Sequence, residues 1–241
     1  MEHNKTVDCY DKHTDAYDTY QYAVIPHYRT ALDMVVATLC EYTCTAPCIL
    51  DLGCGTGNAS SAVLKALPEA RLYLIDGSAS SLDKAVKKIG SQAPESLLGH
   101  SCADLADAGW HRSLPCTFDA VISTFVLEHL PEPEYRNVIG NCTGLLNPGG
   151  WLIAVESYTE KERDLISWFE KLMKENEQNM VDTQTASTVS RLRTREEKHF
   201  FFPKAVKKMW WEECGLIDCH IVWQYLCIAL MAGRAKDTND L

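Results

Sequence analysis

The sequence predicts an α/β fold in which helices cover both faces of a seven-stranded, mostly parallel sheet that ends in an antiparallel hairpin. Two observations carry this prediction. From residue 48 onward, short apolar runs alternate with helical patterns, which is typical of parallel strands joined by right-handed crossovers. The last two apolar runs, 217–223 and 226–231, follow each other with no helical pattern between them, so we expect them to form the hairpin.

The expected strands are short apolar runs bounded by turn residues. They cover residues 48–52, 71–75, a weaker third run ending near Asp104, 118–124, 151–156, 217–223 and 226–231. Apolar residues at helical spacing predict helices at about 57–67, after a Ser78 cap, between Tyr135 and Leu146, between Leu165 and Met173, and from Pro203 to about Cys214. Gly215 suits the C-terminal cap of the last of these helices.

Two segments lie outside this alternating pattern. Residues 1–46 are expected to form an N-terminal helical cap, with a helix opened by Pro26, ahead of a main domain at 47–241. Within that domain, 157–202 is expected to be an insertion that covers the site, because residues 176–198 are polar and lack clear periodicity. A length of 241 residues suits one α/β domain with such a cover.

Composition limits the functional classes. A net charge of −10 argues against broad, nonspecific nucleic-acid binding, although it does not exclude an RNA met through a local basic patch. No apolar run approaches the roughly 18 residues of a membrane helix. Because the first residues also lack a signal-peptide pattern, we expect a cytoplasmic protein with no membrane contact.

The chain has eleven cysteines, which are scattered and are expected to be reduced thiols, mostly in the core. Cys40, Cys44 and Cys48 are spaced four residues apart, which raises the question of a zinc or iron–sulfur site. Pro47 interrupts the helix there and no nearby fourth ligand stands out, so we expect no metal.

A glycine-rich segment between Asp51 and Asn58 is the clearest functional signal. An apolar run ends in a turn that carries Gly53, Gly55 and Gly57, where the backbone can approach a ligand closely. A dinucleotide fingerprint reads G-x-G-x-x-G and receives a pyrophosphate. Here the third glycine comes one position early, and Asp51 would repel a diphosphate. The segment therefore favours a cationic ligand, and it disfavours an NAD-dependent oxidoreductase.

The pattern D-x-G-x-G-x-G resembles the first motif of the class I S-adenosylmethionine-dependent methyltransferases, whose fold is Rossmann-like. Residues 75–82 and 118–130 resemble the second and fourth motifs of that family. Residues 15–18 and 25–28 are similar to bacterial small-molecule methyltransferases and to their relatives in transfer-RNA modification. One branch of those relatives works with a carboxylated cofactor and tends to have serine at the second glycine. Gly55 therefore favours unmodified S-adenosylmethionine (SAM).

The resemblance implies that SAM is the cofactor, that S-adenosylhomocysteine (SAH) is the product, and that each strand end has a role. Asp51 would hold the methionine ammonium, directly or through water, and Asp76 would accept hydrogen bonds from the ribose hydroxyls. Asp104 would meet the adenine amino group, and Thr124 and Phe125 would lie beside the transferable methyl group. The full expected cofactor-binding set is Asp51, Gly53, Cys54, Gly55, Gly57, Asn58, Asp76, Gly77, Ser78, Asp104, Leu105, Thr124, Phe125 and Tyr22.

Methyl transfer from an activated sulfonium requires mainly orientation and exclusion of water. A general base is needed only if the acceptor is too weak an acid to ionise freely. The candidate catalytic residues are His129, Glu128 and His27, and a packing role is the alternative for His129. Asp119, near the start of the fourth strand, is expected to be a structural hydrogen-bonding group.

Two further groups of side chains have alternative interpretations. An aromatic wall beside the sulfonium and ordinary packing are both open for Tyr17, Tyr20 and Tyr22. Two interpretations are open for Arg191, Arg193, Arg195 and Lys198. One is that they bind an acidic substrate or RNA, and the other is that they belong to a solvated lid.

The sequence therefore predicts a methyltransferase that moves a methyl group from SAM to a small-molecule acceptor and works as a monomer or homodimer. Two alternatives remain at this point. One is an enzyme that methylates transfer RNA, and the other is a protein that binds SAM without turnover.

Overall fold

The structure is a computed structural model of the 241-residue chain, and it describes residues 18–19, 21–159, 163–179, 199–237 and 240. No helix within these ranges is long and apolar enough to cross a bilayer.

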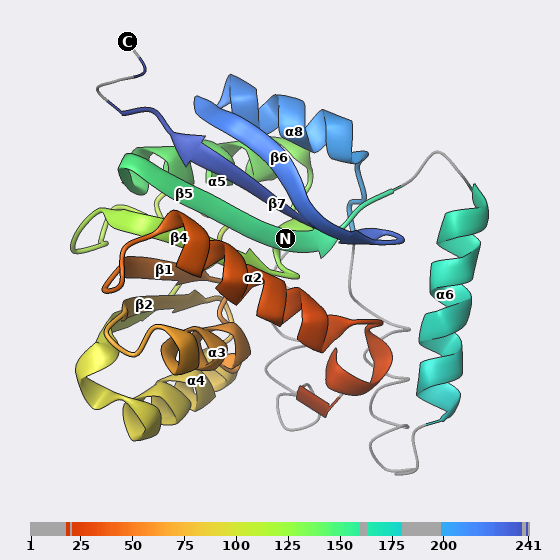
Figure 1. Cartoon of the computed structure of the whole chain (residues 1–241), viewed down its shortest axis with the longest axis horizontal. Coiled ribbons are helices and arrows are strands. Elements are labelled where there is room, and N and C mark those ends of the chain that lie inside the picture. Colours follow the sequence, from red (N-terminus) through yellow and green to blue (C-terminus); the bar gives the residue numbers. More distant parts are fainter. Residues whose placement is uncertain (1–17, 20, 160–162, 180–198, 238–239, 241) are drawn as a thin grey trace.

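Seven strands form one sheet in the order β3-β2-β1-β4-β5-β7-β6 (Figure 1). The first five strands are parallel, and β7 pairs antiparallel with both β5 and β6. The strands are β1 (Cys48–Leu52), β2 (Arg71–Asp76), β3 (Leu97–Cys102), β4 (Phe118–Thr124), β5 (Leu146–Ser157), β6 (Leu216–Tyr225) and β7 (Ile228–Ala235). This topology confirms the predicted fold class, including the C-terminal hairpin.

Helices cover both faces of the sheet, and Figure 1 shows α2, α3 and α4 in front of it with α5 and α8 behind. The helices are α2 (Tyr28–Tyr42), α3 (Asn58–Ala66), α4 (Ala79–Gln92), α5 (Glu132–Leu145), α6 (Arg163–Gln178) and α8 (Lys204–Glu213), with short 3₁₀ helices η1 (Pro94–Ser96) and η2 (Leu127–His129). Residues 18–19 and 21–24 are also helical. Gly215 follows α8 with φ 99°, the left-handed conformation expected of its C-terminal cap.

The sheet divides the interior into two apolar clusters, because successive side chains of a strand point to opposite faces. Ile49 of β1 packs with residues of α2, α3 and α4, whereas its neighbour Leu50 packs with residues of α5 and α8. All five residues of β1 are buried, as expected for a central parallel strand covered on both faces. This rigid centre holds the loops that follow β1, β2 and β4.

The predicted bounds differ most from the structure at the start of β5 and at both ends of β7, which ends at Ala235 and not at residue 231. β5 begins at Leu146, five residues before the predicted start, because the chain pairs with Phe118 before a register shift instead of turning away. Gly149 lies in that irregular stretch with φ 77°. β7 begins at Ile228, since residues 226 and 227 form the hairpin turn and Leu226 takes φ 47°.

Two helices also differ from expectation. The helix that Pro26 was expected to open begins at Tyr28, with His27 at its N-cap in the left-handed region at φ 59°. In α6, Phe169 packs against the cluster that contains Ile49 and Met173 packs with Val24, but Trp168 on the same predicted face is 53% exposed.

Asp119 is a structural hydrogen-bonding group, as predicted. Its Oδ2 accepts from the backbone N–H of Cys48 at 2.8 Å, and its Oδ1 accepts from Asn147 Nδ2 at 2.7 Å. The carboxylate thus joins the starts of β1 and β4 to the irregular stretch of β5.

Candidate functional site

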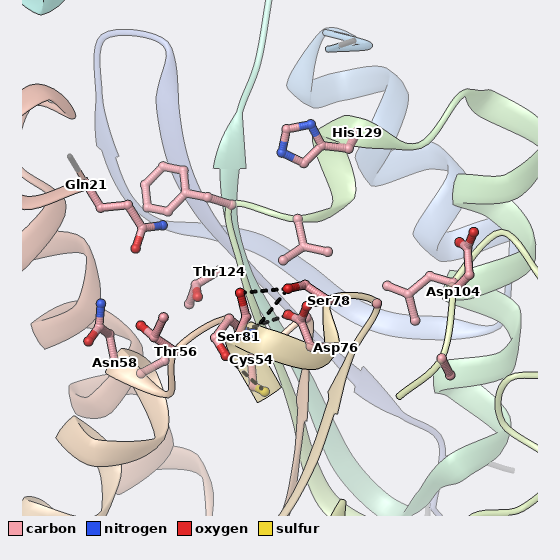
Figure 2. A pocket seen from close by; sticks show the side chains of 18 of the residues that line it. Gln21, Cys54, Thr56, Asn58, Asp76, Ser78, Ser81, Asp104, Thr124 and His129 are labelled. Carbon is pink, nitrogen blue, oxygen red and sulfur yellow. Dashed lines mark hydrogen bonds between the residues drawn. The ribbon is translucent and has the colours of Figure 1, made fainter. Parts of the chain in front are cut away.

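A cavity that opens to solvent lies at the carboxyl ends of β1, β2, β3 and β4 (Figure 2). Such strand ends are where open α/β sheets bind ligands. The charged side chains among its described lining residues are the carboxylates Asp76 and Asp104, with no lysine or arginine. Its charge therefore suits a cationic ligand better than a phosphate.

Most of the expected site residues line this cavity. They are Gly53, Cys54, Gly55, Asn58, Asp76, Gly77, Ser78, Asp104, Leu105, Thr124, Phe125 and His129. Five other expected residues do not line it: Asp51, Gly57, Tyr22, Glu128 and His27. Sequence reasoning did not single out several lining residues, namely Gln21, Thr56, Ala59, Ser81, Ala103, Val126 and Leu130.

The glycine loop is held against the end of β2. The backbone N–H groups of Gly53 and Cys54 both donate to the carbonyl of Ile75 at 2.8 Å. Gly53 has φ 72°, and a Cβ there would lie 2.4 Å from a methyl carbon of Val126. Gly53 is therefore required by the loop conformation and by the close approach of the chain that follows β4.

Gly57 has a different role from the one expected. Its φ of 81° starts α3, and a Cβ would lie 3.1 Å from both Cα and Cβ of Ala85 in α4. Gly57 thus lets two helices pack closely and does not face the cavity.

Asp76 connects the loops that follow β1 and β2. Its Oδ2 accepts from the Gly55 N–H at 2.7 Å, and its Oδ1 accepts from the Ser78 N–H at 2.8 Å. Ser78 also caps α4 by accepting from the Ser81 N–H at 3.1 Å. These bonds hold the carboxylate at the cavity wall, beside Ser78 and Ser81 in Figure 2.

Asp51 lies beneath the loop and is completely buried. Ser60 Oγ donates to its Oδ2 at 2.5 Å, whereas its Oδ1 has no hydrogen-bond partner among the described residues. Burial is the largest cause that raises the pKa of Asp51, to about 7, and the nearby Asp76 raises it further. A cation placed near this carboxyl would relieve both effects.

Asp104 and Leu105 line the cavity after β3. Asp104 Oδ1 accepts from the Ala106 N–H at 2.9 Å, which fixes the turn. Figure 2 shows Asp104 at one end of the cavity and Gln21 with Asn58 at the other.

The segment after β4 forms a further wall. Phe125 has φ 56°, which is rare for a residue with a side chain, and its N–H donates to the Val155 carbonyl at 2.8 Å. Its ring centroid is 5.6 Å from that of Tyr28, whose hydroxyl donates to Gln21 Oε1 at 2.8 Å. Gln21 and Tyr28 thus bring the N-terminal segment onto the wall that Phe125 forms.

The three candidate catalytic residues are placed differently. His129, in η2, lines the cavity and its ring lies 4.6 Å from that of His199. Glu128 points away from the cavity into the protein and is 3% exposed. His27 is exposed and its ring lies 4.1 Å from that of Tyr225.

Asp18 lies in the segment 15–18 that carried part of the resemblance, but the sequence assigned it no role in the site. Its Oδ1 accepts from Thr56 Oγ1 and, at 2.9 Å, from Asn58 Nδ2, both of which line the cavity. Its Oδ2 lies 3.5 Å from Lys88 Nζ, which also donates to Asn58 Oδ1 at 2.8 Å. No periodicity signals this contact, because it depends on how the N-terminal segment folds over α3.

The expected aromatic wall lies only partly within the described residues. Tyr22 is 42% exposed, and its ring packs edge-on against that of Tyr28 at 4.9 Å. The other candidates, Tyr17, Tyr20, Arg191, Arg193, Arg195 and Lys198, lie outside the described residues. Cys40 and Cys44 are exposed and Cys48 is buried, with its sulfur 3.8 Å from that of Cys116.

Comparisons with known proteins agree with this geometry. Residues 50–152 match a family model described as a methyltransferase domain. A ubiquinone biosynthesis O-methyltransferase of Chromobacterium violaceum is 34% identical over 105 residues, which cover 43% of this chain and 41% of that protein. A trans-aconitate 2-methyltransferase of Pseudomonas paraeruginosa is 32% identical over 107 residues, which cover 44% and 34%. The chain thus spans less than half the length of these curated relatives.

A solved structure has a similar fold over nearly the whole chain. The magnesium protoporphyrin IX methyltransferase of Synechocystis PCC 6803, solved with bound SAM, has a TM-score of 0.67 and 16% identity, and the likeness covers 98% of both chains. The matched residues 50–152 contain the glycine loop, Asp76, Asp104 and the segment after β4. This chain therefore has the fold of the SAM-dependent methyltransferases, and its residues 50–152 match a methyltransferase domain.

Proposed function

We propose that this chain transfers the methyl group of SAM to a small-molecule acceptor. The observation that carries the proposal is Asp76, which the Gly55 and Ser78 N–H groups hold at the cavity wall. A carboxylate fixed in this way can accept two hydrogen bonds from a vicinal diol such as the ribose of SAM. A dinucleotide would also offer a ribose, but its pyrophosphate would meet two carboxylates and no lysine or arginine among the described lining residues.

The lining of the cavity supports proposals for the remaining cofactor contacts. We infer that the methionine part lies along Gly53–Gly55 and above Asp51, whose unpartnered Oδ1 supports a bound ammonium. Asp104 and the Leu105 backbone would receive the adenine at the other end of the cavity. Asn58 would contribute to the methionine end, where it already bonds to Asp18.

The acceptor would lie between the N-terminal segment and the loop after β4. Tyr28, Phe125, Val126 and Leu130 supply apolar walls there, and the Gln21 amide and the His129 imidazole supply polar groups. Bound SAM supplies an activated methyl group, so these residues need only orient the acceptor and exclude water. His129 is placed to take a proton from an acceptor that does not ionise by itself.

We also propose that residues 1–46 form a cap over this site and that residues 157–202 cover it. Gln21 and Tyr28, from residues 1–46, line the cavity and support a cap. The cover at 157–202 is supported by His199, which packs on His129.

The relatives suggest the kind of acceptor. The names of two relatives specify a ubiquinone precursor pathway and trans-aconitate, and the solved neighbour is named for a magnesium porphyrin. All three names refer to small molecules, which favours such an acceptor over RNA. The extension of the cavity from Asp76 to His129 favours turnover over binding alone.

The test is Asp76→Ala with SAH titrated in a calorimeter. Loss of the ribose contacts should weaken SAH binding at least tenfold, which is about 1.4 kcal/mol. Asp83→Ala is the matched control, because Asp83 is exposed on α4 and does not line the cavity. Equal SAH affinity in both variants, or no SAH binding by the unmodified chain, would overturn the proposal.

A further inference from the structure

Three charged side chains are buried together directly behind η2. Glu128 of η2, Glu156 of β5 and Lys207 of α8 are 3%, 0% and 0% exposed. Lys207 occupies the buried face of α8 with Trp210 and Trp211, three and four residues further on, where an apolar residue is the rule. Burying an ion carries a penalty of several kcal/mol unless it is paired and hydrogen-bonded, so this departure calls for a reason.

Lys207 and Glu156 form a buried ion pair in which both carboxylate oxygens accept hydrogen bonds. Lys207 Nζ donates to Glu156 Oε2 and lies 4.7 and 4.9 Å from the ring centroids of Tyr135 and Tyr158. Both tyrosine hydroxyls donate to Glu156 Oε1, at 2.9 and 3.3 Å. The Tyr135 hydroxyl in turn accepts from Trp211 Nε1 at 2.9 Å. The pair therefore joins α5, α8 and the end of β5 into one unit.

Glu128 attaches η2 to this unit. η2 packs against β5, and the buried carboxyl of Glu128 lies near enough to Glu156 and Lys207 to interact electrostatically with both, while its Oε2 has no hydrogen-bond partner among the described residues. Its backbone carbonyl accepts from the Phe200 N–H at 2.6 Å. The next residue along the chain is His129, whose ring faces the cavity (Figure 2). The side chain of Glu128 and the ring of His129 thus leave the same short turn in different directions.

We propose that Glu128, Glu156 and Lys207 are positioning residues that hold η2 so that His129 faces the acceptor in methyl transfer. The assignment of the acceptor side rests on the proposed function, whereas the link between the charged cluster and His129 does not. Lys207 is the central member, because its ammonium pairs with Glu156 and also interacts electrostatically with Glu128. Without it, the buried carboxylate of Glu156 would lose its cationic partner beside Glu128 in a medium of low dielectric constant, and η2 would move.

The test compares Lys207→Met with Lys208→Met. The two lysines are adjacent on α8, but Lys208 makes an exposed ion pair with Glu212. The ring signals of His129 are recorded by ¹⁵N NMR in the SAH-free and SAH-saturated proteins and assigned with His129→Gln. We expect Lys207→Met to shift these signals and to change the pKa of His129 by at least 0.5. SAH affinity should stay within threefold, and Lys208→Met should change neither.

A folded Lys207→Met variant with unchanged His129 signals would overturn the proposal. If that variant does not fold, the double variant Glu156→Gln/Lys207→Met removes both charges of the ion pair and is judged by the same His129 criterion. Absence of SAH binding by the unmodified chain would count against the proposed function alone, because the SAH-free spectra still report whether Lys207 positions His129.

Discussion

Gly57 and Gly90 constrain the fold differently, because Gly57 precedes α3 at positive φ and Gly90 lies inside α4. Gly57 has φ 81° and lies against the backbone of Ala85, so a side chain meets both a strained conformation and a steric neighbour. Gly90 lies inside α4, and a Cβ there would meet nothing within 4 Å.

We predict opposite effects of alanine at these two positions. Gly57→Ala should reduce the free energy of unfolding by about 1–3 kcal/mol, the usual range for a non-glycine residue held at positive φ. Gly90→Ala should increase it by about 0.5–1 kcal/mol, because alanine favours a helix interior. Urea denaturation measures both, and a neutral or stabilising Gly57→Ala would contradict the packing role assigned to Gly57.

Asp51 should make cofactor binding depend on pH. Its pKa is raised to about 7 by burial, so the carboxyl is mostly protonated below that pH. A bound ammonium favours the charged carboxylate and lowers its pKa, so by linkage SAH affinity should increase as pH rises from 6 to 8.

The measurement is SAH calorimetry across this pH range with Asp51→Asn alongside. The unmodified chain should bind SAH more tightly at pH 8 than at pH 6, and the variant should lose most of this change. A pH profile that is the same in both proteins would show that Asp51 does not respond to the ligand.

At the scale of elements, the N-terminal segment is fastened to the glycine loop. Asp18 bonds to Thr56 and Asn58, and three residues later Gln21 is buried at the cavity. This segment and α2 contribute to the cavity wall, so a ligand that fills the cavity is retained partly by the Asp18 contacts.

We predict that Asp18→Ala accelerates SAH dissociation by about threefold to tenfold. The loss of hydrogen bonds to a charged group is worth about 1.5–3 kcal/mol each at most, and partial exposure of Asp18 reduces this. Stopped-flow displacement measures the rate, with Asp33→Ala of the exposed side of α2 as control. Equal dissociation rates in the two variants would show that the segment is not fastened through Asp18.

The elements that sequence reasoning located best are those whose pattern is set locally. β1 and β4 match their predicted bounds, because apolar strands of a central parallel sheet are continuous and end in turn residues. The start of β5 was missed, since Asn147–Gly150 reads as a turn and only pairing with β4 keeps it in the strand.

In the site, too, a local sequence pattern predicts some residues, whereas long-range contacts place the others. The spacing of the glycines and the position of Asp76 identify the loops that line the cavity. Contacts between distant segments determine which glycine faces a helix and which of residues 128 and 129 faces the cavity. They also determine what Gln21 contributes. A single sequence holds no local signal for those contacts.

At the scale of the whole molecule, two buried acids lie on different elements of one cooperative domain. Burial raises the pKa of Glu128 to about 8, and the neighbouring Glu156 raises it while Lys207 opposes the shift. Burial raises the pKa of Asp51 to about 7. Their ordinary values in an unfolded chain are about 4.3 and 3.9. Each group is therefore protonated in the folded chain and ionised in the unfolded chain over several pH units.

The consequence for stability has a definite sign. The stabilisation that each raised pKa gives the folded chain is fully present below the unfolded pKa value. It is lost as pH rises toward the folded pKa value, by up to about 1.4 kcal/mol per pH unit for each group. Glu128→Gln keeps the shape of the protonated acid but cannot ionise. Its unfolding free energy relative to the unmodified chain should therefore increase between pH 6 and pH 8.

Urea denaturation at the two pH values measures this difference, and we expect it to grow by at least about 1 kcal/mol. Glu69→Gln is the control, because Glu69 is exposed and its replacement should change stability equally at both pH values. Tyr135, Tyr158 and Lys207 face the cluster around Glu128 and Glu156 and are unchanged in the variant, so they cannot produce the predicted difference by themselves. A Glu128→Gln effect that is the same at pH 6 and pH 8 would mean that Glu128 is already ionised in the folded chain. Lys207 would then balance two carboxylates instead of one.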